Sequence, residues 1–181
     1  MITINNKLKK LREESKLSLR DLGEKTGLSA SFLSQIELGQ VSPSIASLEN
    51  IANALNVHIT HFFDDQTKPD SIVMRKNERK RIYSQGSKAI IQPLAHKISK
   101  KKIEPFMLTL EVGGESGEHP YSSHHGEEFG MVIQGKVRFT LENNEYILED
   151  GDSVYFNSTK PHRWQNIAKK EAFIILVIPG A

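Results

Sequence analysis

The sequence predicts a multidomain α + β protein, with five helices at the N-terminus followed by an antiparallel β-barrel. Apolar residues recur at helical spacing up to residue 63. A polar segment broken by Pro69 comes next. Beyond it, short runs of β-branched and aromatic residues alternate with turn residues, a pattern typical of sandwiches and barrels. We therefore expect a helical domain at 1–65, a linker at 66–71 and a β domain at 72–181.

The composition excludes several kinds of site. The 181 residues include no cysteine, so disulfides, thiolate metal sites and cysteine nucleophiles are absent. Imidazole and carboxylate groups remain as metal ligands. The N-terminal segment lacks the apolar core of an export signal, and no run approaches the roughly 20 apolar residues of a membrane span. We expect a cytoplasmic protein with no membrane partner.

The net charge of +2 conceals three unequal zones. Residues 1–65 hold 7 Lys/Arg against 8 Asp/Glu, residues 66–102 hold 11 against 2, and residues 103–181 hold 6 against 12. The basic middle either adds attraction for phosphate groups or is a solvated segment with lysines on exposed strand edges. Because the N-terminal zone is balanced, its charge alone does not indicate nucleic-acid binding.

Capping residues separate the predicted helices. Ser18, Ser29 and Ser44 stand where a hydroxyl can accept a hydrogen bond from a free amide, and Asp21 completes a capping box with Ser18. Gly27 follows the second apolar block, where a left-handed residue ends a helix. The predicted helices cover 5–15, 18–25, 29–38, 44–55 and 59–63.

The turn between the second and third helices is short. It spans only residues 26–28, which forces the steep crossing of a helix-turn-helix. Residues 7–55 resemble the lambda-repressor-like (Xre-type) helix-turn-helix family. In that family an arginine and a glutamate at the positions of Arg12 and Glu37 form a salt bridge between the first and third helices, which the resemblance implies here.

The resemblance implies that the third helix enters the major groove of double-stranded DNA. The candidates for contact with base edges are Ser29, Ala30, Ser31, Ser34 and Gln35. The candidates for contact with phosphates are Arg20, Gln40 and Ser42. The alternative for each of these residues is a solvated side chain that does not contact DNA. The alternative for the whole domain is a protein-interaction module or an antitoxin. Since one half-site binds weakly, we expect a homodimer or higher oligomer.

The second half of the chain contains many short strands. Gly135, the pair Asn143 and Asn144, and Gly151 lie in the turns between some of them. The predicted strands are 72–75, 89–94, 106–112, 129–134, 136–141, 145–148, 153–156, 162–166 and 172–178.

Two segments of this half resemble the motifs of the cupin family, the double-stranded β-helix. Residues 117–135 (GEHPYSSHHGEEFGMVIQG) resemble the first motif, and residues 151–166 (GDSVYFNSTKPHRWQN) resemble the second. His124 and Glu128 match two ligands of the first motif, and His162 matches the ligand of the second. Ser122 stands where the family has its first histidine.

The matched residues form a set of two imidazoles and one carboxylate. His124, Glu128 and His162 suit one divalent metal such as iron, zinc, manganese or nickel. The alternative is a pocket without metal that binds an organic ligand through the same side chains. The predicted pocket comprises Ser122, His124, Glu128, Phe139, Tyr155, His162 and Trp164.

The combined pattern resembles the helix-turn-helix regulators that carry a cupin domain. It implies a sequence-specific DNA-binding transcription regulator whose cupin domain binds a small-molecule effector. The alternative is a mononuclear non-haem iron enzyme that resembles the phosphonate epoxidases, which also place a helical domain before a cupin. The polar third helix and the Arg12 and Glu37 pair favour the regulator, and no catalytic residues are assigned.

Overall fold

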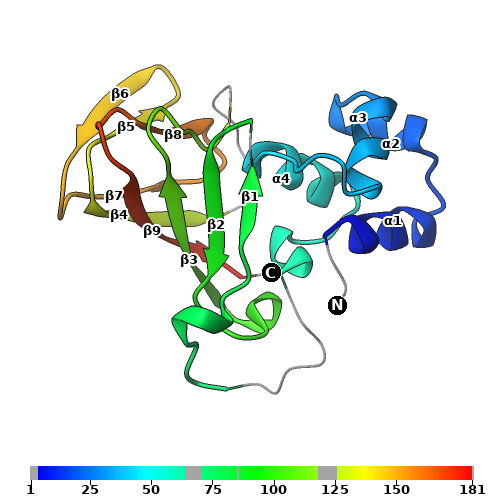
Figure 1. Cartoon of the computed structure of the whole chain (residues 1–181), viewed down its shortest axis with the longest axis horizontal. Coiled ribbons are helices and arrows are strands. Elements are labelled where there is room, and N and C mark those ends of the chain that lie inside the picture. The colour runs from blue at the N-terminus through cyan, green and yellow to red at the C-terminus, as the bar shows by residue number, and fades with distance from the viewer. Residues whose placement is uncertain (1–3, 64–70, 85, 118–125, 181) are drawn as a thin grey trace.

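The computed structural model describes residues 4–63, 71–84, 86–117 and 126–180 (Figure 1). The helical part comprises α1 (Ile4–Glu14), α2 (Leu19–Thr26), α3 (Ala30–Glu37), α4 (Ile45–Ala54) and the 3₁₀ helix η1 (Ile59–Phe62). The four α-helices agree with the prediction to within one or two residues. The fifth helix is only a 3₁₀ turn, because four residues are too few to propagate an α-helix. The predicted domain boundary and linker lie largely outside the described residues.

The helix ends carry the predicted caps. The Ser18 hydroxyl accepts a hydrogen bond from the Asp21 amide, and the Asp21 carboxylate accepts one from the Ser18 amide. Gly27 has φ 72°, a left-handed conformation that costs glycine little. A methyl group on Gly23 would lie 2.7 Å from the Leu28 carbonyl oxygen. The turn that joins α2 to α3 therefore packs tightly on α2, which sets the crossing of the two helices.

The β part comprises nine strands among the described residues. They are β1 (Ile82–Ser84), β2 (Ala89–Pro93), β3 (Ile103–Leu110), β4 (Glu127–Gln134), β5 (Val137–Leu141), β6 (Asn144–Leu148), β7 (Ser153–Asn157), β8 (His162–Asn166) and β9 (Ala172–Pro179). Two short 3₁₀ helices, η2 (Lys76–Glu78) and η3 (Ile98–Lys100), lie between them.

The predicted strand at 72–75 is wrong, and β1 was missed. Ile72 is fully exposed and Val73 is 43% exposed, so this segment has no buried face to hold it in a sheet. β1 has only three residues and follows a basic run, which hides its alternation. The other eight predicted strands correspond to β2 to β9.

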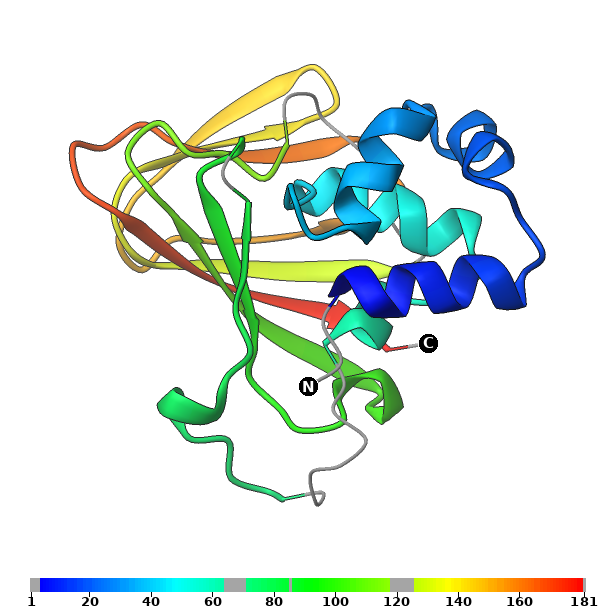
Figure 2. The same ribbon diagram turned by 45° about the vertical axis from the view of Figure 1, so that its right-hand side comes forward.

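The strands form two antiparallel sheets of a sandwich-like barrel, which agrees with the predicted antiparallel β fold (Figure 2). The larger sheet has the order β1-β2-β3-β9-β4-β7 and the smaller has the order β6-β5-β8. No strand ladder joins the two sheets among the described residues. Phe139 is central to the core, with its ring centroid 4.6 Å from Trp164 and 5.0 Å from Phe156.

The helical part packs against the larger sheet through η1. The Thr60 hydroxyl donates a hydrogen bond of 3.1 Å to Glu104 Oε1, and His58 Nδ1 lies 2.8 Å from Glu104 Oε2. Phe63 and Phe106 pack with their ring centroids 5.5 Å apart. Buried apolar residues of both parts belong to one continuous core. None of the described helices is long and apolar enough to span a membrane.

Candidate functional site

The outer face of α3 presents most of the predicted base-reading residues to solvent. Ala30, Ser31 and Gln35 are exposed, whereas Ser34 is half-buried. Ser29 is exposed, and its hydroxyl accepts a hydrogen bond of 3.1 Å from the Phe32 amide. Because that oxygen caps the helix, Ser29 has less freedom than the others to contact a base.

The predicted phosphate contacts lie in the segments that precede and follow α3 in the chain. Arg20 is exposed in the first turn of α2, where its Nε lies 3.4 Å from Glu24 Oε1. Gln40 and Ser42 are exposed in the loop after α3. All three side chains are therefore open to solvent, and their contact with phosphates stays a prediction.

Arg12 and Glu37 join α1 to α3. Arg12 Nε and Nη2 donate to the two Glu37 carboxylate oxygens at 2.7 and 3.0 Å, and Nη1 donates to the Leu17 carbonyl at 2.9 Å. The hydrogen bond to Glu37 raises the pKa of Arg12 above its ordinary value. Both side chains are largely buried, so this pair fixes α3 from behind its exposed face.

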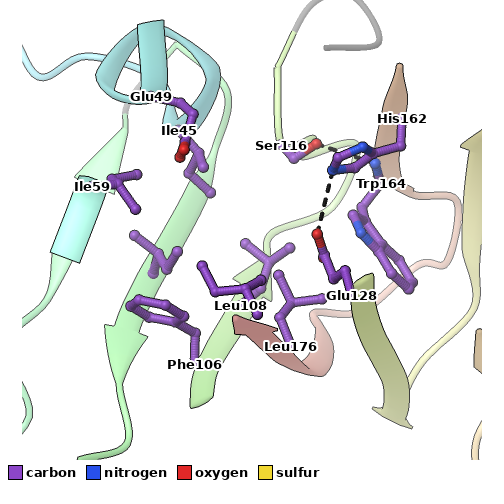
Figure 3. Close-up of a pocket in the computed structure, with 12 residues that line it drawn as sticks. Ile45, Glu49, Ile59, Phe106, Leu108, Ser116, Glu128, His162, Trp164 and Leu176 are labelled. Carbon is purple, nitrogen blue, oxygen red and sulfur yellow. Dashed lines mark hydrogen bonds and ion pairs between the residues drawn. The ribbon is translucent and has the colours of Figure 1, made fainter. Parts of the chain in front are cut away.

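A cavity lies between the helical part and the sheets (Figure 3). The cavity and the open solvent at its mouth together amount to about 450 Å³ of space not filled by atoms. Its lining combines a few polar side chains with an apolar wall, which is typical of a small-molecule site. The described lining residues are Ile45, Glu49, Ile59, Ile91, Phe106, Leu108, Ser116, Glu128, His162, Trp164, Leu176 and Ile178.

Two of the predicted metal ligands meet at this cavity. Glu128 on β4 and His162 on β8 are both buried, with Glu128 Oε2 3.5 Å from His162 Nε2. His162 Nδ1 lies 2.9 Å from the Lys160 carbonyl oxygen, which can only accept, so Nδ1 carries a proton. Nε2, on the other side of the ring, faces Glu128 and is the nitrogen that a metal would take, as in histidine ligands held by a backbone carbonyl.

These two donors fit a divalent metal in chemistry and orientation. Within the described residues, no group of three His, Asp or Glu side chains is positioned to hold one. The predicted third ligand, His124, lies outside the described residues, as does Ser122.

Of the three predicted aromatic pocket residues, only Trp164 lines the cavity. Phe139 is a core residue that packs behind Trp164. Tyr155 is 66% exposed, and its hydroxyl donates to Glu127, which raises the pKa of Tyr155. It points away from the core because strand alternation places Phe156, and not Tyr155, on the inner face. A methyl group on Gly130 would lie 2.6 Å from the Trp164 ring, so this glycine makes room for the indole.

Sequence reasoning missed the contribution of the helical part to the cavity. Ile45, Glu49 and Ile59 come from α4 and η1, yet they line a cavity otherwise formed by the β part. One signal was present in the sequence. Glu49 follows Ile45 by four residues and therefore lies on the apolar face of its helix, where a carboxylate is out of place.

The carboxyl group of Glu49 is strongly perturbed. Its side chain is 4% exposed. Burial, together with the charges of Glu128 and Glu104, raises the pKa of Glu49 from 4.5 to about 8. At neutral pH most of this carboxyl is therefore protonated in the molecule as it stands.

Both parts of the chain match known families. Residues 8–62 match the Helix-turn-helix family and residues 106–179 match the Cupin domain family. The HTH-type transcriptional regulator PuuR of Escherichia coli is 29% identical over 163 residues, which cover 88% of this chain and 85% of PuuR. SutR of the same organism is 28% identical over 164 residues, which cover 90% and 86%. SinR of Bacillus subtilis is 30% identical over 107 residues, which cover 58% of this chain and 88% of SinR.

Solved structures show a similar relationship. An HTH_3 family transcriptional regulator from Vibrio cholerae has a TM-score of 0.74 and 26% identity, covering 98% of this chain and 95% of the other. Hydroxypropylphosphonic acid epoxidase from S. wedmorenis has a TM-score of 0.51 and 19% identity, covering 96% and 95%. The epoxidase likeness shows the fold alone, so the regulator is favoured over the enzyme. The chain therefore belongs to the helix-turn-helix transcriptional regulators of the lambda-repressor-like (Xre) type that carry a C-terminal cupin domain.

Proposed function

We propose that this regulator binds a two-fold symmetric operator as a homodimer through α3, and that a small molecule in the interdomain cavity controls this binding. The observation that carries the proposal is the origin of the cavity walls. Ile45 and Glu49 come from the DNA-binding domain, whereas Glu128 and His162 come from the cupin domain. A ligand in the cavity therefore contacts both domains at once.

The DNA-reading part of the proposal rests on Gln35. Its amide is exposed on α3, and a glutamine amide can bond both N6 and N7 of adenine. Ser29, Ala30, Ser31 and Ser34 supply shorter contacts, while Arg20, Gln40 and Ser42 bind phosphates and set the register.

The regulatory part rests on α4. This helix packs against α2, the first helix of the helix-turn-helix, and also lines the cavity. A ligand that favours one position of α4 over another shifts the population of DNA-competent conformations by its difference in affinity for the two. In this proposal α4 alone couples the cavity to the helix-turn-helix.

A divalent metal is the alternative occupant that we propose for the cupin side of the cavity. Glu128 and His162 would hold iron, zinc, manganese or nickel together with His124, and Ser122 would line the same site. The metal would supply a fixed positive charge beside the cavity. The regulator is proposed to work in the cytoplasm, where operator DNA and small metabolites are both present.

Selection of bound sequences from a random DNA pool tests the proposal. The full chain should enrich an inverted repeat with half-sites about one helical turn apart. Gln35→Ala should relax one position in each half-site, a loss of about 1–3 kcal/mol of discrimination. Asn50→Ala, which removes an exposed amide on α4, is the matched control and should enrich the parent sequence. Failure to enrich any repeat would contradict the proposal.

A further inference from the structure

The carboxyl group of Glu49 points into the cavity (Figure 3). It belongs to the DNA-binding domain, and only 4% of the residue is exposed. No described residue donates a hydrogen bond to it or forms an ion pair with it. Buried carboxylates are normally paired, because removing a charge from water without compensation is costly. The missing partner is therefore sought in a molecule that enters the cavity.

The charged side chains of the lining indicate the charge of that molecule. Glu128 lines the cavity from β4, and its charge and that of Glu104 act on Glu49. Among the described lining residues there is no lysine or arginine. Because a nearby positive charge favours the ionised form of a carboxyl, a cation in the cavity would favour release of the Glu49 proton and pair with the carboxylate, whereas an anion would not.

The apolar part of the lining indicates the chemistry of the uncharged part of the molecule. Ile91, Phe106 and Leu108 belong to the apolar lining of the cavity. The Trp164 indole lies on the cupin side, near Glu128 and His162 (Figure 3). An alkyl chain gains by covering the apolar wall, and an ammonium group gains by contact with an indole face. A bare metal ion would use Glu128 and His162 but would leave Glu49 and the apolar wall without a role.

We propose that the cavity binds a small organic ammonium ion, with the charged group between Glu49 and Glu128 and the alkyl part against the apolar wall. This inference rests on the proposed regulation by a cavity ligand and names its chemical class. Since Glu49 is on α4 and Glu128 is on β4, one bound cation links the DNA-binding domain to the cupin domain. The ligand then fixes α4 relative to the larger sheet.

Calorimetric titration of the full chain with three matched probes tests this proposal. The probes are n-butylammonium chloride, n-butanol and sodium butyrate, which share an alkyl chain and differ in charge. The ammonium ion should bind at least about tenfold more tightly than either control, since only it pairs with the carboxylates. Glu49→Gln should weaken its binding about tenfold, whereas Glu14→Gln, at an exposed position on α1, should not change it. Glu128→Gln serves as a second variant, and circular dichroism verifies that each variant is folded.

Three outcomes would overturn the inference. They are equal or tighter binding of butyrate, no detectable binding of butylammonium up to about 10 mM, and butylammonium binding that Glu49→Gln leaves unchanged. Zinc chloride binding in the absence of ammonium binding would also overturn it in favour of a metal site. Operator binding is measured on the same samples without probe. Specific DNA binding without ammonium binding overturns this inference alone, whereas loss of specific DNA binding overturns the proposed function itself.

Discussion

Replacing Glu49 by glutamine is expected to stabilise the folded protein at neutral pH. The pKa of this buried carboxyl is raised from 4.5 to about 8, first by burial and then by the charges of Glu128 and Glu104. In the unfolded chain the same carboxyl is exposed and ionises near its ordinary pKa. Between pH 4.5 and 8 the unfolded state therefore releases a proton that the folded state retains. Each pH unit in this window lowers the free energy of unfolding by about 1.4 kcal/mol.

The size of this stability loss follows from the difference between pH 7 and the pKa of the carboxyl in the unfolded chain. About 2.5 pH units give a loss of roughly 3 kcal/mol at pH 7, which glutamine avoids because it does not ionise. Below pH 4.5 both states hold the proton, so parent and Glu49→Gln should differ little.

Urea unfolding followed by circular dichroism at pH 4, 6 and 7 measures this difference. Glu14→Gln is the matched control, and loss of its exposed pair with Lys10 should change stability by only a few tenths of a kcal/mol. A Glu49→Gln variant less stable than the parent at pH 7 would refute the reasoning. A stabilisation that does not shrink toward pH 4 would refute it equally.

Two further substitutions test the packing of each domain. Arg12→Ala should lower the free energy of unfolding by about 3 kcal/mol in urea titrations, because it leaves the largely buried Glu37 carboxylate unpaired; a loss below about 0.5 kcal/mol would show that the pair is solvated. Gly130→Ala should displace the Trp164 ring toward the cavity, shift the fluorescence of the single tryptophan and cost about 1–3 kcal/mol. Unchanged fluorescence and stability would mean that the strand yields instead of the indole.

The sequence predicted the DNA-binding domain well because its signals are local. Ser18, Ser29 and Ser44 each cap a helix by accepting from the amide three residues further on, and Gly27 ends α2 through its own backbone conformation. Such features depend on neighbouring residues in the chain. The four α-helices and the turn between α2 and α3 could therefore be placed to within about two residues of their observed bounds.

The cavity could be predicted only in part, because its walls come from segments far apart in the chain. The cupin motifs located Glu128 and His162, which face each other across β4 and β8. Tyr155 was misplaced because a run of apolar residues does not show which side chain of a strand faces inward. Glu49 was missed because nothing local indicates that α4 covers the cavity, and only the polar residue on its apolar face hinted at it.

The central claim is that this chain is a dimeric DNA-binding regulator. Footprinting of the full chain on the DNA upstream of its own gene, at about 0.15 M salt, tests it most directly. The account predicts one protected region with two-fold symmetry, two half-sites about one helical turn apart, and affinity that falls steeply as salt rises. Protection of no specific sequence at that salt concentration would contradict it.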